Sequence, residues 1–195
     1  MGLFDIFRKK KNNSSKVDPP TKEEIDFAEA TKRIFGSSLE QFDFKLHRGE
    51  LEKWFTTIIY RKDKLYIKIS GSTHPRDYPN SYNVVLGEGD SEDFFQWDWN
   101  SIALWRLKKE IKPTEKAQDY SFPRPDKYDY SLTNAKQELL QYATEFLNGD
   151  LALFYETRKK QNQEREPYKI HSPDDKGNYR TTDEATSVEQ KKKYS

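Results

Sequence analysis

The sequence predicts an α+β fold: an antiparallel β-meander of four to five strands, with an N-terminal helix and a C-terminal helix pair packed on one face. Two observations predict this class. Apolar and polar residues alternate in several short segments between residues 42 and 99, whereas helical periodicity occurs before and after them. The first strands are also joined by short turns, which favour hairpin neighbours over crossover connections.

Composition divides the 195 residues into three parts. Residues 1–20 and 169–195 are mostly Lys, Asn, Ser, Asp and Thr, whereas all four tryptophans lie between them. We therefore expect a single α+β domain over residues 21–168, a flexible N-terminal segment over residues 1–20, and a disordered tail over residues 169–195. Aromatic side chains, which bury large areas each, are expected to supply much of the domain's core.

The first predicted helix begins at Thr21. This residue and Glu24 have the spacing of a capping box. Ile25 and Ile34 belong to an apolar stripe at helical spacing, and Gly36 is placed to end the helix.

Strands are predicted next, over residues 42–46, 54–60, 65–69 and 82–86. A turn over residues 48–50 is expected between the first two. The second segment is rich in β-branched and aromatic residues on both faces, as in a central strand. Phe95, Trp97 and Trp99 alternate and predict a short fifth strand.

The last elements are helical. A brief helix is expected from about Ser101 to Ile111, followed by an irregular, proline-containing connection over residues 112–130. The helix pair then covers residues 135–148 and a second segment from Asp150. Only the start of this second helix is apolar, so we expect its end to project into solvent.

Composition argues against several functional classes. With 34 basic and 33 acidic residues, the net charge is +1, without the basic excess of a nucleic-acid binder. The absence of cysteine excludes disulfides, thiolate nucleophiles and Cys-ligated zinc. Nucleotide-binding motifs are also missing, so we expect no cofactor and no metal centre. No bilayer-spanning run or secretion signal is present, and we expect a cytoplasmic protein.

The loop over residues 74–80 is the strongest candidate for chemistry. His74 and Asp77 could act as a general acid–base pair or as two metal ligands, with Arg76 binding an anion. The alternative is a rigid connector between two strands, stiffened by its prolines, that presents Arg76 and Tyr78 to a partner. We favour the connector.

Residues 90–98 mix aromatic and acidic side chains. If the strand alternation holds, Phe94 and Asp98 face away from the core and form, with Asp93, an acidic–aromatic rim. Such a rim suits recognition of a basic protein partner. The alternative is that these aromatics simply belong to the core.

The N-terminus combines a short apolar turn with a run of cations, a pattern that can bind an anionic membrane surface. The candidate membrane contacts are Leu3, Phe4, Ile6, Phe7, Arg8, Lys9 and Lys10. One helical turn buries too little to anchor a protein alone, so a frayed or docking terminus is favoured.

These patterns favour a non-catalytic cytoplasmic protein-binding module, for example an immunity- or antitoxin-type inhibitor that covers a partner enzyme. The Lys-, Asn- and Tyr-rich usage is typical of bacteria with AT-rich genomes. Two alternatives stay open: a membrane-peripheral scaffold anchored by residues 3–11, at the inner membrane face, and a hydrolase or nuclease that uses His74, Arg76 and Asp77.

Overall fold

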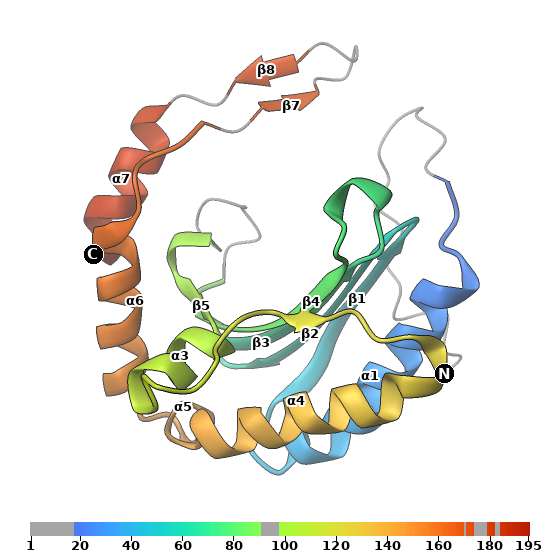
Figure 1. Cartoon of the computed structure of the whole chain (residues 1–195). Helices are drawn as coiled ribbons and strands as arrows, with labels where there is room; N and C mark the ends of the chain where they lie inside the picture. The colour runs from blue at the N-terminus through green and yellow to red at the C-terminus, as the bar shows by residue number, and fades with distance from the viewer. Residues whose placement is uncertain (1–17, 91–97, 170, 174–178, 182–183) are drawn as a thin grey trace.

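A computed structural model describes residues 18–90, 98–169, 171–173, 179–181 and 184–195. It contains an antiparallel sheet in meander order, an N-terminal helix and several C-terminal helices (Figure 1). The predicted α+β class is therefore confirmed. Within the described part of the chain, no helix is long and apolar enough to cross a bilayer.

The main sheet has six strands in the order β1-β2-β3-β4-β5, with β6 pairing against the start of β4. Their bounds are β1 Lys45–Glu52, β2 Phe55–Lys62, β3 Leu65–Ser72, β4 Ser81–Glu88, β5 Ser101–Ala103 and β6 Tyr120–Ser121. The helices are α1 Lys22–Glu40, α3 Leu104–Ile111, α4 Tyr128–Tyr142, α5 Thr144–Asn148, α6 Ala152–Glu164 and α7 Glu184–Tyr194, with 3₁₀ turns η2 Pro75–Asp77 and η3 Pro125–Lys127. A separate hairpin joins β7 His171–Pro173 to β8 Tyr179–Thr181.

Helices α1 and α4 cover one face of the sheet (Figure 1). Phe27 of α1 lies against the rings of Tyr82 and Tyr128, with ring centroids 5.5 and 5.7 Å apart respectively. The apolar side chains of β2, β3 and β4 that face these helices are almost completely buried, among them Ile58 and Ile67. The core therefore depends strongly on aromatic contacts, as composition predicted.

The first helix follows the predicted start but not the predicted end. Its capping box is present: the Glu24 carboxylate accepts hydrogen bonds from the backbone N–H of Thr21, at 2.7 Å, and from its hydroxyl. The helix continues through Gly36 to Glu40 because the next turn places Leu39 in the core, fully buried. Burial of that apolar side chain outweighs the weak helix propensity of glycine.

The first hairpin lies further along the chain than predicted. Residues 48–50 are inside β1 rather than in a turn, and the hairpin loop is Lys53 and Trp54. A bulge between Leu46 and Arg48 shifts the strand register by one residue. The predicted strand over residues 42–46 was thus placed too early. Moving the turn allows all eight residues of β1 to lie in a strand.

The fifth strand also differs from the prediction. Residues 95–97 lie outside the described residues, Asp98 and Trp99 are helical, and β5 begins at Ser101. Trp99 is fully buried.

The end of α6 was predicted to project into solvent, and this is wrong. Asn162 is fully buried and Gln161 is nearly so. Their side-chain amides donate to the backbone carbonyls of Trp99 and Ser101, at 2.8 and 3.0 Å. Because these amide N–H groups donate to buried backbone carbonyls, a polar helix segment can be buried at the edge of the sheet.

Beyond residue 169, the described structure contains α7, which packs against α6, whereas we expected a tail without fixed structure (Figure 1). The contact is polar. Asn162 donates to the carbonyl of Tyr194 at 2.8 Å, and the Ser187 hydroxyl accepts from the backbone N–H of Tyr168 at 3.0 Å. Apolar periodicity, on which the sequence prediction depended, cannot reveal a helix held in this way.

Candidate functional site

The face of the sheet opposite α1 and α4 is lined by polar side chains. Strand register places Thr57 beside Ser70, and Ser70 beside Asn83, across β2, β3 and β4. Neighbouring residues on each strand point the other way, into the core. The pairing of these strands therefore produces a row of hydroxyl and amide groups on the open face.

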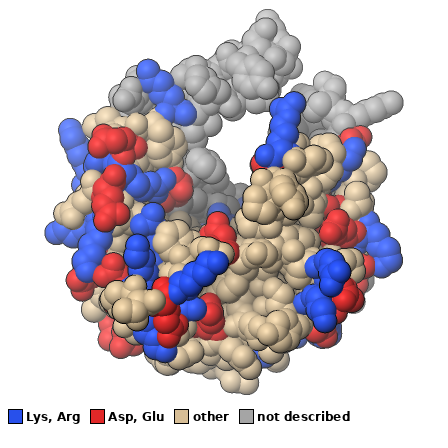
Figure 2. Space-filling model, in the orientation of Figure 1, with Lys and Arg blue, Asp and Glu red and all other residues tan. Residues whose placement is uncertain are grey.

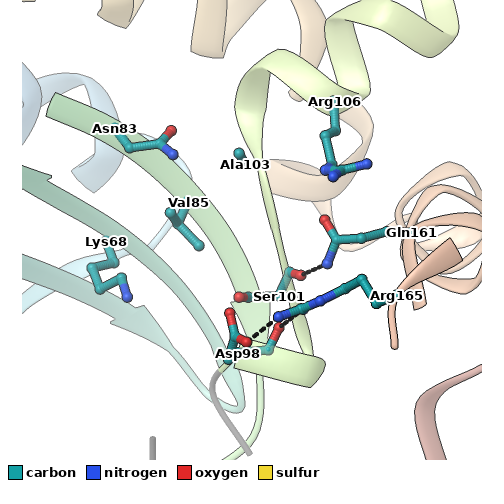
Figure 3. Close-up of a pocket in the computed structure, with 9 residues that line it drawn as sticks. All are labelled: Lys68, Asn83, Val85, Asp98, Ser101, Ala103, Arg106, Gln161 and Arg165. Atoms are coloured by element: carbon teal, nitrogen blue, oxygen red, sulfur yellow. Dashed lines mark hydrogen bonds and ion pairs between the residues drawn. The ribbon is translucent and has the colours of Figure 1, made fainter. Parts of the chain in front are cut away.

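A cavity of about 330 Å³ lies between this face and α6 (Figure 3). Strand residues line one side of it, and residues of α3 and of the end of α6 approach from the other side (Figure 3). The lining residues are Lys68, Asn83, Val85, Asp98, Ser101, Ala103, Arg106, Gln161 and Arg165. We call this the basic cavity.

A second hollow of about 250 Å³ lies on the same face. Asn83 lines both hollows. The residues of the open face that bring hydroxyl groups to the second hollow are Thr57, Ser70, Ser72 and Ser81. Phe55 also lines it and is 44% exposed. We call this the hydroxyl groove. In the space-filling view the molecule is hollowed between the sheet and the α6 side, where many Lys and Arg side chains lie among acidic ones (Figure 2).

Cations outnumber carboxylates in the basic cavity. Lys68, Arg106 and Arg165 line it with a single acid, Asp98. The Asp98 carboxylate accepts hydrogen bonds from the Arg165 guanidinium and from the Tyr168 hydroxyl, and Arg165 also donates to the Asp98 backbone carbonyl at 3.0 Å. Burial and the Asp98 charge both raise the pKa of Tyr168, so this hydroxyl stays protonated and continues to donate. The Asp98 charge is thus largely satisfied within the protein.

Arg106 is held less firmly. Its ion pair with Glu164 spans 3.9 Å, and the Glu164 side chain is 74% exposed. A long, solvent-exposed ion pair contributes little to stability. The Arg106 guanidinium is therefore available to interact with a ligand at small cost.

Lys68 lies on the floor of the basic cavity, on the central strand β3. Burial lowers the pKa of its ammonium group, while the negative charges of Asp98 and Glu50 oppose that effect. An anion entering the cavity would reduce the cost of keeping Lys68 charged. The cavity is thus suited to holding an anionic group by charge and hydrogen bonding.

The predicted candidate residues of the 74–80 loop lie together in and beside the turn η2. His74 Nδ1 accepts from the backbone N–H of Arg76 at 3.1 Å, and Asp77 accepts from the Ser72 hydroxyl at 2.6 Å. The His74 ring packs edge-on against Trp54, with centroids 4.7 Å apart. The two side chains considered as an acid–base pair, His74 and Asp77, are thus each engaged in local contacts that stabilise the loop between β3 and β4.

Two other residues of this loop, Arg76 and Tyr78, are exposed, Tyr78 by 85%. This exposure is compatible with presentation to a partner. The peptide bond between Tyr78 and Pro79 is cis.

The remaining predicted contacts divide into two groups. Asp93 and Phe94, with the membrane-contact residues of the N-terminus, lie outside the described residues. Asp98 is described, and its carboxylate accepts hydrogen bonds from Arg165 and Tyr168.

Sequence reasoning missed the basic cavity. Lys68 carried a weak signal, because it is a cation within a strongly apolar β-strand. Arg106 and Arg165 carried none, since each belongs to a charge-rich helix or helix end that resembles ordinary solvated surface.

In the described segments, no group of three or more His, Asp or Glu side chains could hold a metal ion. Comparison with known proteins gave no match: the chain is matched by no protein-family model, no curated protein and no solved structure.

Proposed function

We propose that this protein is a non-catalytic protein-binding module that acts in the cytoplasm and holds a partner protein on the open face of its sheet. The observation that carries the proposal is the polar open face itself. It joins the hydroxyl groove to the basic cavity through a shared residue, Asn83. An inhibitor of the immunity or antitoxin type, which acts by covering another protein, would use a surface of this kind.

The local engagement of His74 and Asp77 supports binding over catalysis. A general base must be able to reach a substrate proton. Here His74 Nδ1 accepts from Arg76, and the Asp77 carboxylate accepts from Ser72. These hydrogen bonds give both residues a structural role in the connector between β3 and β4.

Affinity capture from the native host with variant proteins tests the proposal. Ser70→Arg places a large cation in the middle of the open face, while Gln137→Arg makes a comparable change on the exposed side of α4. We expect wild type and Q137R to recover the same stoichiometric partner and S70R to lose it. Circular dichroism and thermal unfolding of each variant establish that the fold is retained.

Two outcomes contradict the proposal. Capture of the same partner by S70R and wild type would place binding elsewhere on the molecule. Absence of a stoichiometric partner under several growth conditions would argue against a binding module.

A further inference from the structure

We infer that the basic cavity receives an acidic side chain from an extended segment of the partner protein. This inference rests on the proposed function and specifies its chemistry. Composition suggested a basic partner, because acidic residues surround the aromatics of residues 90–98. The cavity itself points to the opposite charge.

The charge of the cavity favours a carboxylate. Lys68, Arg106 and Arg165 outnumber Asp98, the single acid in the lining, and Asp98 is already bonded to Arg165 and Tyr168. The Arg106 guanidinium lies 4.8 Å from the centroid of the Trp105 ring, and its ion pair to the exposed Glu164 spans 3.9 Å. It can exchange that long ion pair for a stronger, charge-assisted bond to a buried carboxylate. Arg106 is therefore the residue that gains most from an incoming acid.

The polar lining of the basic cavity favours a ligand that carries a hydrogen-bond donor as well as a negative charge. Asn83 Oδ1 is buried and has no hydrogen-bond partner among the described residues. A buried acceptor without a donor is costly. A ligand that supplies an N–H to it therefore removes that cost and adds a hydrogen bond to the complex. A peptide carries both groups, since each acidic residue has a backbone N–H beside its carboxylate-bearing side chain.

The size and neighbours of the cavity also fit a peptide. Its volume of about 330 Å³ is at the small end for ligand pockets, which suits one or two side chains rather than a large cofactor. The adjoining hydroxyl groove offers Ser70 and Ser81 to the backbone of the same segment. An extended segment could thus place one acidic side chain in the basic cavity and lay its polar backbone along the hydroxyl groove.

Fluorescence anisotropy with short labelled peptides tests the inference on the full chain. The probes are N-acetylated, C-amidated peptides of six glutamates, six serines or six lysines, at low ionic strength. Of the three peptides, we expect only the glutamate peptide to bind, with an affinity that falls as the salt concentration is raised. Arg106→Gln should weaken binding by about tenfold or more, which is the worth of one charge-assisted hydrogen bond.

Lys109→Gln is the matched control, because it removes one positive charge from the exposed side of the same helix. Equal weakening by R106Q and K109Q would show a general charge effect and overturn the inference. Preferential binding of the lysine peptide would overturn it as well. Displacement of the glutamate peptide by inorganic phosphate, at an ionic strength where chloride has no effect, would indicate a small-anion site and not a peptide site.

The inference and the proposed function can fail separately. If R106Q captures the host partner as well as wild type does, while S70R loses it, the open face binds a partner without an acidic anchor. If both variants capture the partner, the proposed function itself is wrong.

Discussion

The hydroxyl of Thr73 donates to the buried carboxylate of Glu24 at 2.7 Å, which joins the chain after β3 to the first turn of α1. The same carboxylate accepts from the backbone and the hydroxyl of Thr21, and Thr56 donates to the Glu24 backbone carbonyl at 3.4 Å. One acidic side chain thus caps a helix and ties that helix to the sheet.

Thr73→Val should lower the free energy of unfolding by about 1–3 kcal/mol, because it removes a hydrogen bond to a charged, buried acceptor. Urea unfolding at pH 7 measures the change. Thr73→Ser keeps the hydroxyl and serves as the control, with a smaller loss expected. Equal losses in the two variants would show that the methyl group of Thr73, and not its hydroxyl, carries the stability.

The contribution of Glu24 should depend on pH. Burial raises the pKa of this carboxyl, but the hydrogen bonds from Thr21, Thr73 and the backbone together outweigh burial and lower it below its ordinary value of 4.5. A carboxyl with a lowered pKa stabilises the fold above pH 4.5, and this stabilisation is lost as the pH falls through the folded-state pKa.

Urea unfolding of wild type and T73V over a series of pH values below 7 tests that dependence. Protonation of Glu24 removes the negative charge that accepts the hydrogen bond from Thr73. The difference in unfolding free energy between wild type and T73V should therefore narrow at low pH. A difference that stays constant down to pH 3 would contradict the assignment.

The capping box illustrates how far the sequence could go. Thr21 and Glu24 are three residues apart, and local spacing was enough to predict their contact. The partnership of Glu24 with Thr73 spans 49 residues, and it depends on where the end of β3 lies over the helix. No local pattern contains that information.

The candidate site shows the same limit more strongly. Alternation predicted the strands whose side chains form the open face, yet it did not indicate which face would lack a helical cover. The cavity needs Lys68 of β3, Arg106 of α3 and Arg165 at the end of α6. Arg106 and Arg165 look like ordinary surface charges until the helices are packed, and Lys68 stands out only as a cation within an apolar strand.

Gly87→Ala should destabilise the fold. A Cβ atom at residue 87 would lie 2.1 Å from the ring of Tyr66, a residue that is almost completely buried. The Tyr66 hydroxyl donates to Asn100 Oδ1 at 3.1 Å. The ring cannot move without leaving this contact, so we expect a loss of about 1–3 kcal/mol in urea unfolding. In a Tyr66→Leu background the added methyl should cost much less. A cost that is the same in both backgrounds would show that the backbone at residue 87, not the ring, requires glycine.

Asn162→Ala should release α7 from α6. The side-chain amide bonds the carbonyls of both Trp99 and Tyr194, and its removal leaves two acceptors without a donor. Trypsin should then cleave faster at the lysines near the C-terminus, with fragments identified by mass spectrometry. Gln163→Ala changes the adjacent, exposed amide and is the control. Cleavage at the same rate in N162A, Q163A and wild type would mean that these hydrogen bonds do not hold the helix.

Lys68→Met should raise stability at pH 7 by about 1 kcal/mol, because it removes a charge that is costly to bury. Burial lowers the pKa of Lys68 below its ordinary value of 10.5, so the folded protein binds this proton less well than the unfolded chain does. The resulting penalty is fully present below the folded-state pKa and disappears as the pH rises towards 10.5. The advantage of K68M in urea unfolding should therefore shrink between pH 7 and pH 10.

Lys109→Met, on an exposed helix face, should show no such trend. An advantage of K68M that grows with pH would mean that Lys68 is stabilised, and not strained, in its charged form.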